Sequence, residues 1–216
     1  MIAVVGFYRT GTHWLCMLIQ EYFGHPVEGR AFFEHYQVLQ SPAWGFIDHD
    51  IRGDFVPPHQ AVYIYRDPVD VIFSLSRTYK GWEPTPATVR ENAELYGVQL
   101  GRWLTPGYTE HVAVVRYERM REDFPRVCLL VHREFDASRF DRVFAIATKE
   151  RVTQSRGQSP WLARPDSDLE YAQARAGFRS EYAGLVWDTV LAERRWLLLH
   201  FDHLPEKKQW QKQSTM

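Results

Sequence analysis

The first residues of this chain, 2–15, read IAVVGFYRTGTHWL. A short apolar run leads into a turn that contains Gly6 and Gly11, and apolar residues at helical spacing follow. This pattern predicts a buried strand, a tight loop and a helix whose N-terminus faces the loop. Backbone N–H groups at such a junction converge on an anion, and the helix dipole adds to the attraction. We therefore interpret residues 6–14 as a phosphate-binding loop.

The residues inside the loop indicate which phosphate ligand it suits. A nucleoside-triphosphatase loop has the form G-x-x-x-x-G-K-[ST], in which the Lys reaches the terminal phosphates and the Ser or Thr holds Mg²⁺. Here the glycines keep that spacing, but Thr12 and His13 stand in the Lys and Ser/Thr positions, and the cation is Arg9. A strand–turn–helix corner with two permissive glycines would look similar. The hydroxyls and the guanidinium favour an oxyanion site over that alternative.

Composition narrows the class of protein. The 216 residues are enough for one α/β domain with a substantial core, and 45% hydrophobic with 25% charged residues is ordinary for a folded protein. The net charge of −1 gives no overall basic field, so nucleic acid is not an expected partner. Aromatic residues make up 15% of the chain and include eight Trp, which suggests an aromatic-lined pocket.

Cysteine usage and hydropathy bear on the compartment. Cys16 and Cys128 lie far apart in apolar, helix-like contexts, which is more typical of buried packing residues than of a disulfide or metal pair. The N-terminal residues lack a basic leader, so we expect a strand there and not a signal peptide. No apolar run approaches the roughly 20 residues that span a membrane. A cytoplasmic location is the expectation.

Alternation of strands and helices predicts the fold. The expected class is α/β, a single domain with a central parallel sheet, helices on both faces and a P-loop nucleotide-binding type of architecture. The domain is expected to cover residues 1–204, followed by a polar tail, 205–216, and a loop is expected from Gln154 to Asp168. The expected strands are 2–5, 44–50, 61–65 and 111–117. The expected helices are 14–23, 30–40, 68–77, 87–104, 124–134, 137–149 and 187–201.

Four candidate functional residues follow four of the expected strands. They are Arg9, His49, Arg66 and Tyr117. Because ligands bind at the carboxyl ends of the strands in parallel sheets, we expect these side chains to share one site.

Two stretches together resemble the sulfotransferases that use 3′-phosphoadenosine 5′-phosphosulfate (PAPS). Residues 8–14, YRTGTHW, are similar to that family's P-K-S-G-T-T-W loop around the 5′-phosphosulfate. Residues 65–74, YRDPVDVIFS, are similar to its R-[ND]-P-x-D-x-x-x-S element around the 3′-phosphate. A weaker match, RYERM at 116–120, resembles a Y-E-D-M turn after a strand. The matches occur in family order within about residues 1–150.

The resemblance implies a set of cofactor contacts. PAPS would act as the sulfuryl donor and 3′-phosphoadenosine 5′-phosphate (PAP) would be its product, with no metal required. Two anionic ends need two anion sites, and Arg66 with Ser74 would supply the second one. Arg175-Ala176-Gly177 is similar to a segment that closes over the 3′-phosphate in the family, and Arg156-Gly157 is a second candidate. The implied cofactor-binding residues are Tyr8, Arg9, Thr10, Gly11, Thr12, His13, Trp14, Arg66, Ser74, Tyr117, Thr148 and Arg175.

The resemblance also implies catalytic roles. Arg9 replaces the family's Lys; it keeps the charge, so it would stabilise the leaving phosphate without donating a proton. His49 corresponds to the histidine of a K-T-H motif whose Lys and Thr are missing here, and it is the candidate general base. His13 and His59 are its rivals.

The aromatic residues near the expected chemistry suggest the acceptor pocket. Trp44, Phe46, Tyr79 and Trp82 would suit a small phenolic, glycan or lipid-like acceptor, and the sequence does not choose among these. The oligomeric state is equally open. Two other functions remain alternatives: a P-loop nucleoside or small-molecule kinase, and a PAP-binding module without catalysis.

Overall fold

One parallel sheet forms the centre of the molecule. The computed structural model describes residues 2–24, 33–35, 45–48, 60–78, 82–105, 112–148 and 167–201. Within these stretches all strand pairings are parallel, and the strand order is β2-β3-β1-β4-β5. The strands are β1 (Ile2–Val5), β2 (Phe33–His35), β3 (Gly45–Asp48), β4 (Gln60–Tyr65) and β5 (Val112–Arg116). The α/β class is confirmed, as are the four strands expected from their apolar runs.

The register of the sheet brings the candidate segments to one edge. Val5 of β1 is paired with Asp48 on one side and with Tyr63 on the other. The β4–β5 pairing continues to Tyr65 and Arg116. Because the strands are parallel, the segments that follow β1, β4 and β5 all leave the sheet at the same end.

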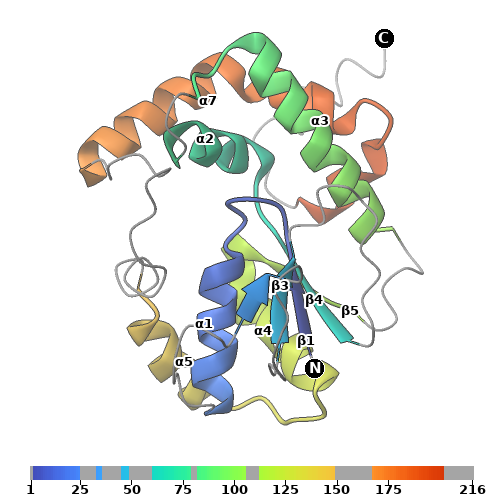
Figure 1. Cartoon of the computed structure of the whole chain (residues 1–216), viewed down its shortest axis with the longest axis vertical. Coiled ribbons are helices and arrows are strands. Elements are labelled where there is room, and N and C mark those ends of the chain that lie inside the picture. The colour runs from blue at the N-terminus through green and yellow to red at the C-terminus, as the bar shows by residue number, and fades with distance from the viewer. Residues whose placement is uncertain are drawn as a thin grey trace.

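The helices form two groups, one against each face. The first group is α1 (Thr12–Phe23), α4 (Met120–Leu130) and α5 (Ala137–Ile146). The second is α2 (Pro68–Thr78), α3 (Pro86–Trp103) and α7 (Asp168–Leu191), with the 3₁₀ helix η3 (Arg195–His200). Figure 1 shows α2, α3 and α7 gathered together, away from α1 and α5.

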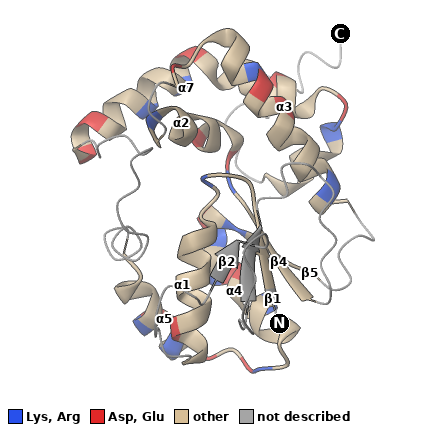
Figure 2. Ribbon diagram, in the orientation of Figure 1, with Lys and Arg blue, Asp and Glu red and all other residues tan. Residues whose placement is uncertain are grey.

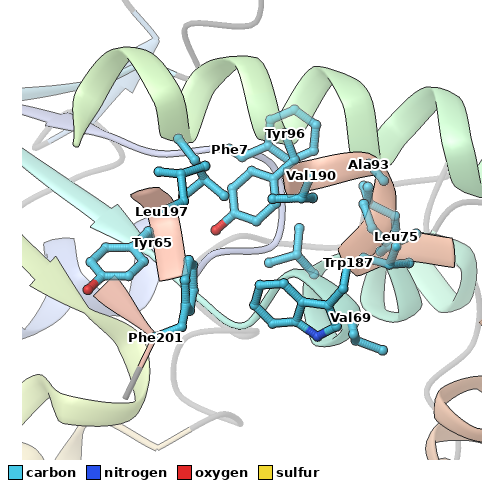
Figure 3. Close-up of a cluster of buried hydrophobic side chains, with 14 of the residues drawn as sticks. Phe7, Tyr65, Val69, Leu75, Ala93, Tyr96, Trp187, Val190, Leu197 and Phe201 are labelled. Carbon is cyan, nitrogen blue, oxygen red and sulfur yellow. The ribbon is translucent and has the colours of Figure 1, made fainter. Parts of the chain in front are cut away.

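Each helical group buries its own set of side chains. Val4, Val62 and Ile64 point to the α1 side, where they share a core with Leu15 and Phe124. Alternate residues of the same strands face the other group, in a core rich in aromatic rings. Figure 3 shows part of this second core, where Tyr65, Tyr96, Trp187 and Phe201 meet. The period of two along each strand explains why the two cores divide in this way.

Helix signals in the sequence account for two starts in the second group. Asp67 caps α2, since its Oδ1 accepts hydrogen bonds from the backbone N–H groups of Val69 and Asp70. Thr85 caps α3 in a capping box with Thr88. The expected helices 14–23, 68–77 and 87–104 are confirmed within two residues, whereas α4 and α5 each begin or end a few residues away from expectation. Of the described helices, none combines the length and apolarity needed to cross a membrane.

The helix expected at residues 30–40 is wrong in its centre. Phe33–His35 instead forms β2, which pairs with β3 at the edge of the sheet. The apolar spacing there fitted a short helix, but a strand of three residues is too short to reveal a period, and its pairing partner lies elsewhere in the chain.

The helix expected at 187–201 is also wrong. Trp187 and Val190 belong to the last turns of α7, which starts at Asp168, and a separate 3₁₀ helix follows at Arg195. A capping box of Ser167 with Glu170 starts α7. Its buried positions include Phe178, Tyr182 and Val186, four residues apart, a signal that was present in the sequence. Most of the expected loop at 154–168 and the expected tail at 205–216 lie outside the described residues.

The close packing of α3 against α7 can be tested by replacing a glycine of each helix. A Cβ at Gly97 would lie 3.1 Å from the Val190 Cα, against backbone that cannot easily yield, whereas a Cβ at Gly177 meets nothing within 4 Å. We expect Gly97→Ala to lower the free energy of unfolding by about 1–3 kcal/mol. Gly177→Ala should raise it by about 0.5–1 kcal/mol, because Ala loses less backbone entropy inside a helix. Urea unfolding measures both; a stabilising Gly97→Ala would contradict the close crossing.

Candidate functional site

The candidate site lies at a switch point of the sheet. The loop after β1 leads to α1 on one face, and the segment after β4 leads to α2 on the other face. β1 and β4 are neighbours, so the two chain directions diverge between them. A crevice at such a point is the usual ligand site of an open parallel sheet.

The loop after β1 is a strained, self-bonded turn. Its centre is the Phe7 carbonyl, which accepts hydrogen bonds from the Thr10 backbone N–H at 3.3 Å and from the Thr10 hydroxyl at 2.7 Å. Arg9 has a positive φ of 68°, which is uncommon for a residue with a side chain, and Gly11 has a φ of 100°. Backbone held in such conformations is concentrated at functional sites.

The N-terminus of α1 carries no acidic group of its own. Gly11 is its N-cap residue, no side chain caps it, and its first turn contains no Asp or Glu. The positive end of the helix dipole and its first N–H groups therefore lack an intrahelical counter-charge. Together with Arg9 in the preceding turn, this geometry suits an anion.

The ring of Tyr117 connects the loop to Arg66. Tyr117 starts the 3₁₀ helix η2 (Tyr117–Arg119), directly after β5. A Cβ at Gly11 would lie 2.6 Å from the Tyr117 Cδ2, so only glycine lets the ring rest against the loop. The Arg66 Cζ lies 4.4 Å from the centroid of the same ring, in cation–π contact. The structure thus brings the loop and Arg66 to within one aromatic ring of each other.

Arg66 is held loosely by two carboxylates. Its Nη2 lies 3.8 Å from the Asp70 Oδ2, and its Nε lies 3.9 Å from the Glu118 Oε1. Both distances exceed a hydrogen bond, and the buried Nε has no hydrogen-bond partner among the described residues. The ion pair with Asp70, which would be a purely structural role for Arg66, is therefore present but weak in geometry. An oxyanion would supply the acceptor that Nε lacks.

Ser74 faces the first loop. Its Oγ accepts a hydrogen bond of 3.1 Å from the Nε of Arg9, and the residue is 4% exposed. Two residues that were predicted to bind opposite ends of the cofactor, Arg9 and Ser74, are thus in direct contact. A shared phosphate ligand for Ser74 and Arg66 stays a prediction.

Arg175 reaches the site from α7. Its Nε and Nη2 donate to the two carboxylate oxygens of Asp70 at 2.7 and 2.5 Å. One helical turn later, Arg179 donates to Asp70 at 2.7 Å and lies 3.3 Å from Asp67. Figure 2 shows acidic and basic residues close together along α2 and α7. Sequence analysis missed Arg179, although its spacing of four from Arg175 places both on one helix face.

Asp70 is a buried residue whose carboxylate interacts with the guanidinium groups of three arginines. It is 5% exposed, and burial on its own would raise the pKa of its carboxyl group. The hydrogen bond from Arg175 and the charges of Arg66, Arg175 and Arg179 outweigh that effect, so the pKa lies below the ordinary value of an aspartate. The carboxylate is therefore ionised at neutral pH and ties α7 to the start of α2.

The residues that were expected to contact the adenine lie near one another. The indole N–H of Trp14 donates to the Ala147 carbonyl at 2.8 Å, and its ring lies 5.0 Å from that of Tyr117. Thr148 follows Ala147 directly and is exposed. Phe144 packs edge-on to Trp14 at 5.3 Å. The structure thus brings Trp14, Tyr117 and Thr148 into one neighbourhood, in which Trp14 also has a packing role.

The remaining predicted residues divide into two groups. Tyr8 is 37% exposed, Thr12 is buried in the first turn of α1 and His13 is half-buried. Trp82 packs against the core shared by α2, α3 and α7. Outside the described side chains lie the candidate base His49, its rival His59, the acceptor residues Trp44, Phe46 and Tyr79, and the segment Arg156-Gly157.

No protein-family model matches the sequence, and no curated protein matches it. The interpretation of the site therefore depends on its own geometry and on the two short motifs.

The interactions of the Asp70 carboxylate with these arginines give a testable prediction. Asp70→Asn should lower the free energy of unfolding by roughly 2–4 kcal/mol at pH 7, because it leaves partly buried guanidinium groups without their counter-charge. Since the folded pKa is lowered, the carboxylate stabilises the fold above its ordinary pKa of about 3.9, and this contribution fades as the pH falls through the lowered value. The difference between wild type and variant should therefore shrink only in acid.

The matched control is Asp141→Asn. Asp141 pairs with Arg121 at 2.8 Å, but both side chains are half exposed or more, so the expected cost is under about 1 kcal/mol. Chemical unfolding at pH 7 and pH 3 measures both variants. Equal costs at pH 7 would show that the Asp70 cluster does not hold α7 in place.

Proposed function

We propose that this protein is a sulfotransferase that moves a sulfuryl group from PAPS to a hydroxyl or amine group of an acceptor. The observation that carries the proposal is the pairing of two arginine-bearing anion positions at one edge of the sheet. Arg9 lies in the loop after β1 and Arg66 follows β4, with the Tyr117 ring against both the loop and Arg66. A cofactor with two separated anionic ends needs such an arrangement, and ATP does not carry a 3′-phosphate to fill the second position.

The loop supports a P-loop type of nucleotide site in this proposal. Strand, glycine turn and uncapped helix occur in the required order, and the backbone N–H groups of residues 11–14 would hold the 5′-phosphate. Thr12 and His13 in place of Lys and Ser/Thr remove the usual magnesium ligand, so the proposal needs no metal. Trp14 and Tyr117, whose rings touch each other, would contact the adenine.

In-line sulfuryl transfer requires that the protein position the donor and the acceptor and stabilise the charge that develops on the leaving group. The acceptor oxygen or nitrogen forms the new bond to sulfur while the bond from sulfur to the phosphate oxygen breaks, and PAP leaves with the negative charge. Arg9 would stabilise that charge, and its contact with Ser74 fixes the guanidinium at the base of the loop. His49 directly follows Asp48, the residue of β3 that is paired with Val5, and it would take the acceptor's proton.

Ligand-dependent stability is the first test. PAP without metal should raise the unfolding temperature, and at about 100 times its dissociation constant it would stabilise the fold by about 2.7 kcal/mol. ATP with Mg²⁺ should have little effect, because it has no 3′-phosphate for Arg66. Thermal unfolding with each ligand, with and without EDTA, measures this. Stabilisation by ATP with Mg²⁺ alone would instead support a kinase.

Catalysis is the second test, and it does not require the natural acceptor. Water can serve as the acceptor, so that PAPS is split into PAP and sulfate. Arg9→Ala should slow this reaction by about 100-fold or more, and His49→Ala by a similar factor. Arg121→Ala, which alters only an exposed ion pair, is the control. If PAP binds but both site variants retain full activity, the proposed catalytic roles are wrong.

A further inference from the structure

A single buried hydroxyl serves both backbone groups of Arg66. The Arg66 N–H donates to the Tyr96 Oη at 2.9 Å, and the Tyr96 O–H donates to the Arg66 carbonyl at 2.8 Å. Tyr96 comes from the middle of α3 and has no exposed surface. The hydroxyl thus acts as a hydrogen-bond donor and an acceptor at the same time.

Arg66 needs such a partner because the sheet has ended. The last paired residues of β4 and β5 are Tyr65 and Arg116, and α2 begins only at Pro68. The backbone of Arg66 therefore lies between two regular elements, where neither a ladder nor a helix satisfies it. Buried backbone groups without partners are costly, so the Tyr96 hydroxyl helps to fix this short connection, together with Glu118, whose Oε1 accepts a hydrogen bond from the Asp67 N–H.

The ring of Tyr96 packs against Phe7, which lies in the loop after β1. Its centroid lies 5.0 Å from that of Phe7, at an interplanar angle of 34°. Figure 3 shows Phe7 and Tyr96 side by side in the core. The Phe7 carbonyl is the atom on which the Thr10 hydrogen bonds close the loop. One side chain of α3 therefore touches the base of the loop with its ring and the backbone of Arg66 with its hydroxyl.

Burial keeps that hydroxyl in a single state. Desolvation raises the pKa of Tyr96 well above its ordinary value, and the nearby charges of Glu118 and Asp67 act in the same direction, against the backbone hydrogen bond to Arg66. The phenol is therefore neutral at neutral pH, where both hydrogen bonds persist.

We propose that Tyr96 is a positioning residue that fixes Arg66 relative to the β1–α1 loop and so makes the site selective for nucleotides with a 3′-phosphate. The inference rests on the proposed function, since it assigns the 3′-phosphate to Arg66. The ring sets the distance from the loop, and the hydroxyl sets the backbone orientation from which the guanidinium extends. Loss of the hydroxyl alone should therefore weaken the contact with the 3′-phosphate and leave the contact with the 5′-phosphate intact.

The test compares two nucleotides and three variants by calorimetric titration. PAP carries both phosphates, and adenosine 5′-phosphate lacks the one at the 3′ position. Tyr96→Phe should weaken PAP binding by roughly tenfold, the effect of one lost buried hydrogen-bond partner, with adenosine 5′-phosphate changed less than about twofold. Arg66→Ala should weaken PAP binding further than Tyr96→Phe does and should also leave the affinity for adenosine 5′-phosphate nearly unchanged.

Tyr63→Phe is the matched control. Tyr63 is also fully buried, and its hydroxyl donates to the Gln99 Oε1 of the same helix α3 at 3.4 Å. The Tyr63→Phe variant also loses a buried hydroxyl of this core, and it should keep both affinities. If Tyr96→Phe weakens the two nucleotides equally, or neither of them, the inference fails while the proposed function stands. If wild-type protein does not prefer PAP over adenosine 5′-phosphate, both fail.

Amide hydrogen exchange gives a readout that needs no ligand. The Arg66 N–H is protected by the Tyr96 oxygen, so Tyr96→Phe should speed exchange in a peptide covering Arg66 and Asp67 by about tenfold, without a similar change in α1. Unchanged exchange at Arg66 in this variant would overturn the proposal even if PAP affinity fell.

Discussion

The parallel pairing of β1 with β4 is the constraint on which the site depends. These two strands lie side by side at the centre of the sheet, with Val5 opposite Tyr63. Their carboxyl ends therefore open together, and the chain leaves toward α1 on one face and toward α2 on the other. This divergence separates two connections that would otherwise collide, and the space between them is where Arg9, Arg66 and Tyr117 gather. A change in strand order would scatter these residues.

Two carboxylates, those of Asp70 and Glu118, each interact with more than one hydrogen-bond donor in the site. Asp70 receives hydrogen bonds from Arg175 and Arg179 and lies near Arg66, while Glu118 accepts a hydrogen bond from Arg116 and another from the Asp67 backbone. A guanidinium has five N–H donors, and one carboxylate cannot occupy those of three arginines. The arrangement keeps several cationic groups close together at a tolerable cost, because each has a partial partner, and a doubly charged ligand would find donors already oriented.

The sequence was most informative where local chemistry decides the structure. Apolar runs predicted the central strands, and Asp67 before Pro68 predicted the start of α2, because buried strands and capped helices have local signatures. It was least informative where distant partners decide. The three residues of β2 become a strand by pairing with β3, and the contact of Ser74 with Arg9 joins segments 65 residues apart. Tyr96 carried no signal at all, since a tyrosine among apolar helix positions looks like core packing.

The hydrogen bond from Trp14 to Ala147 has a consequence for biosynthesis, since it spans 133 residues of chain. Strand β1 and its glycine turn are synthesised well before α5, so their neighbours in the finished fold are made much later. Topologies dominated by such distant contacts fold slowly, and the early segment stays exposed meanwhile. Translation must therefore run through α5 before Trp14 can make this hydrogen bond, and a nascent chain halted earlier would leave part of the apolar face of α1 uncovered.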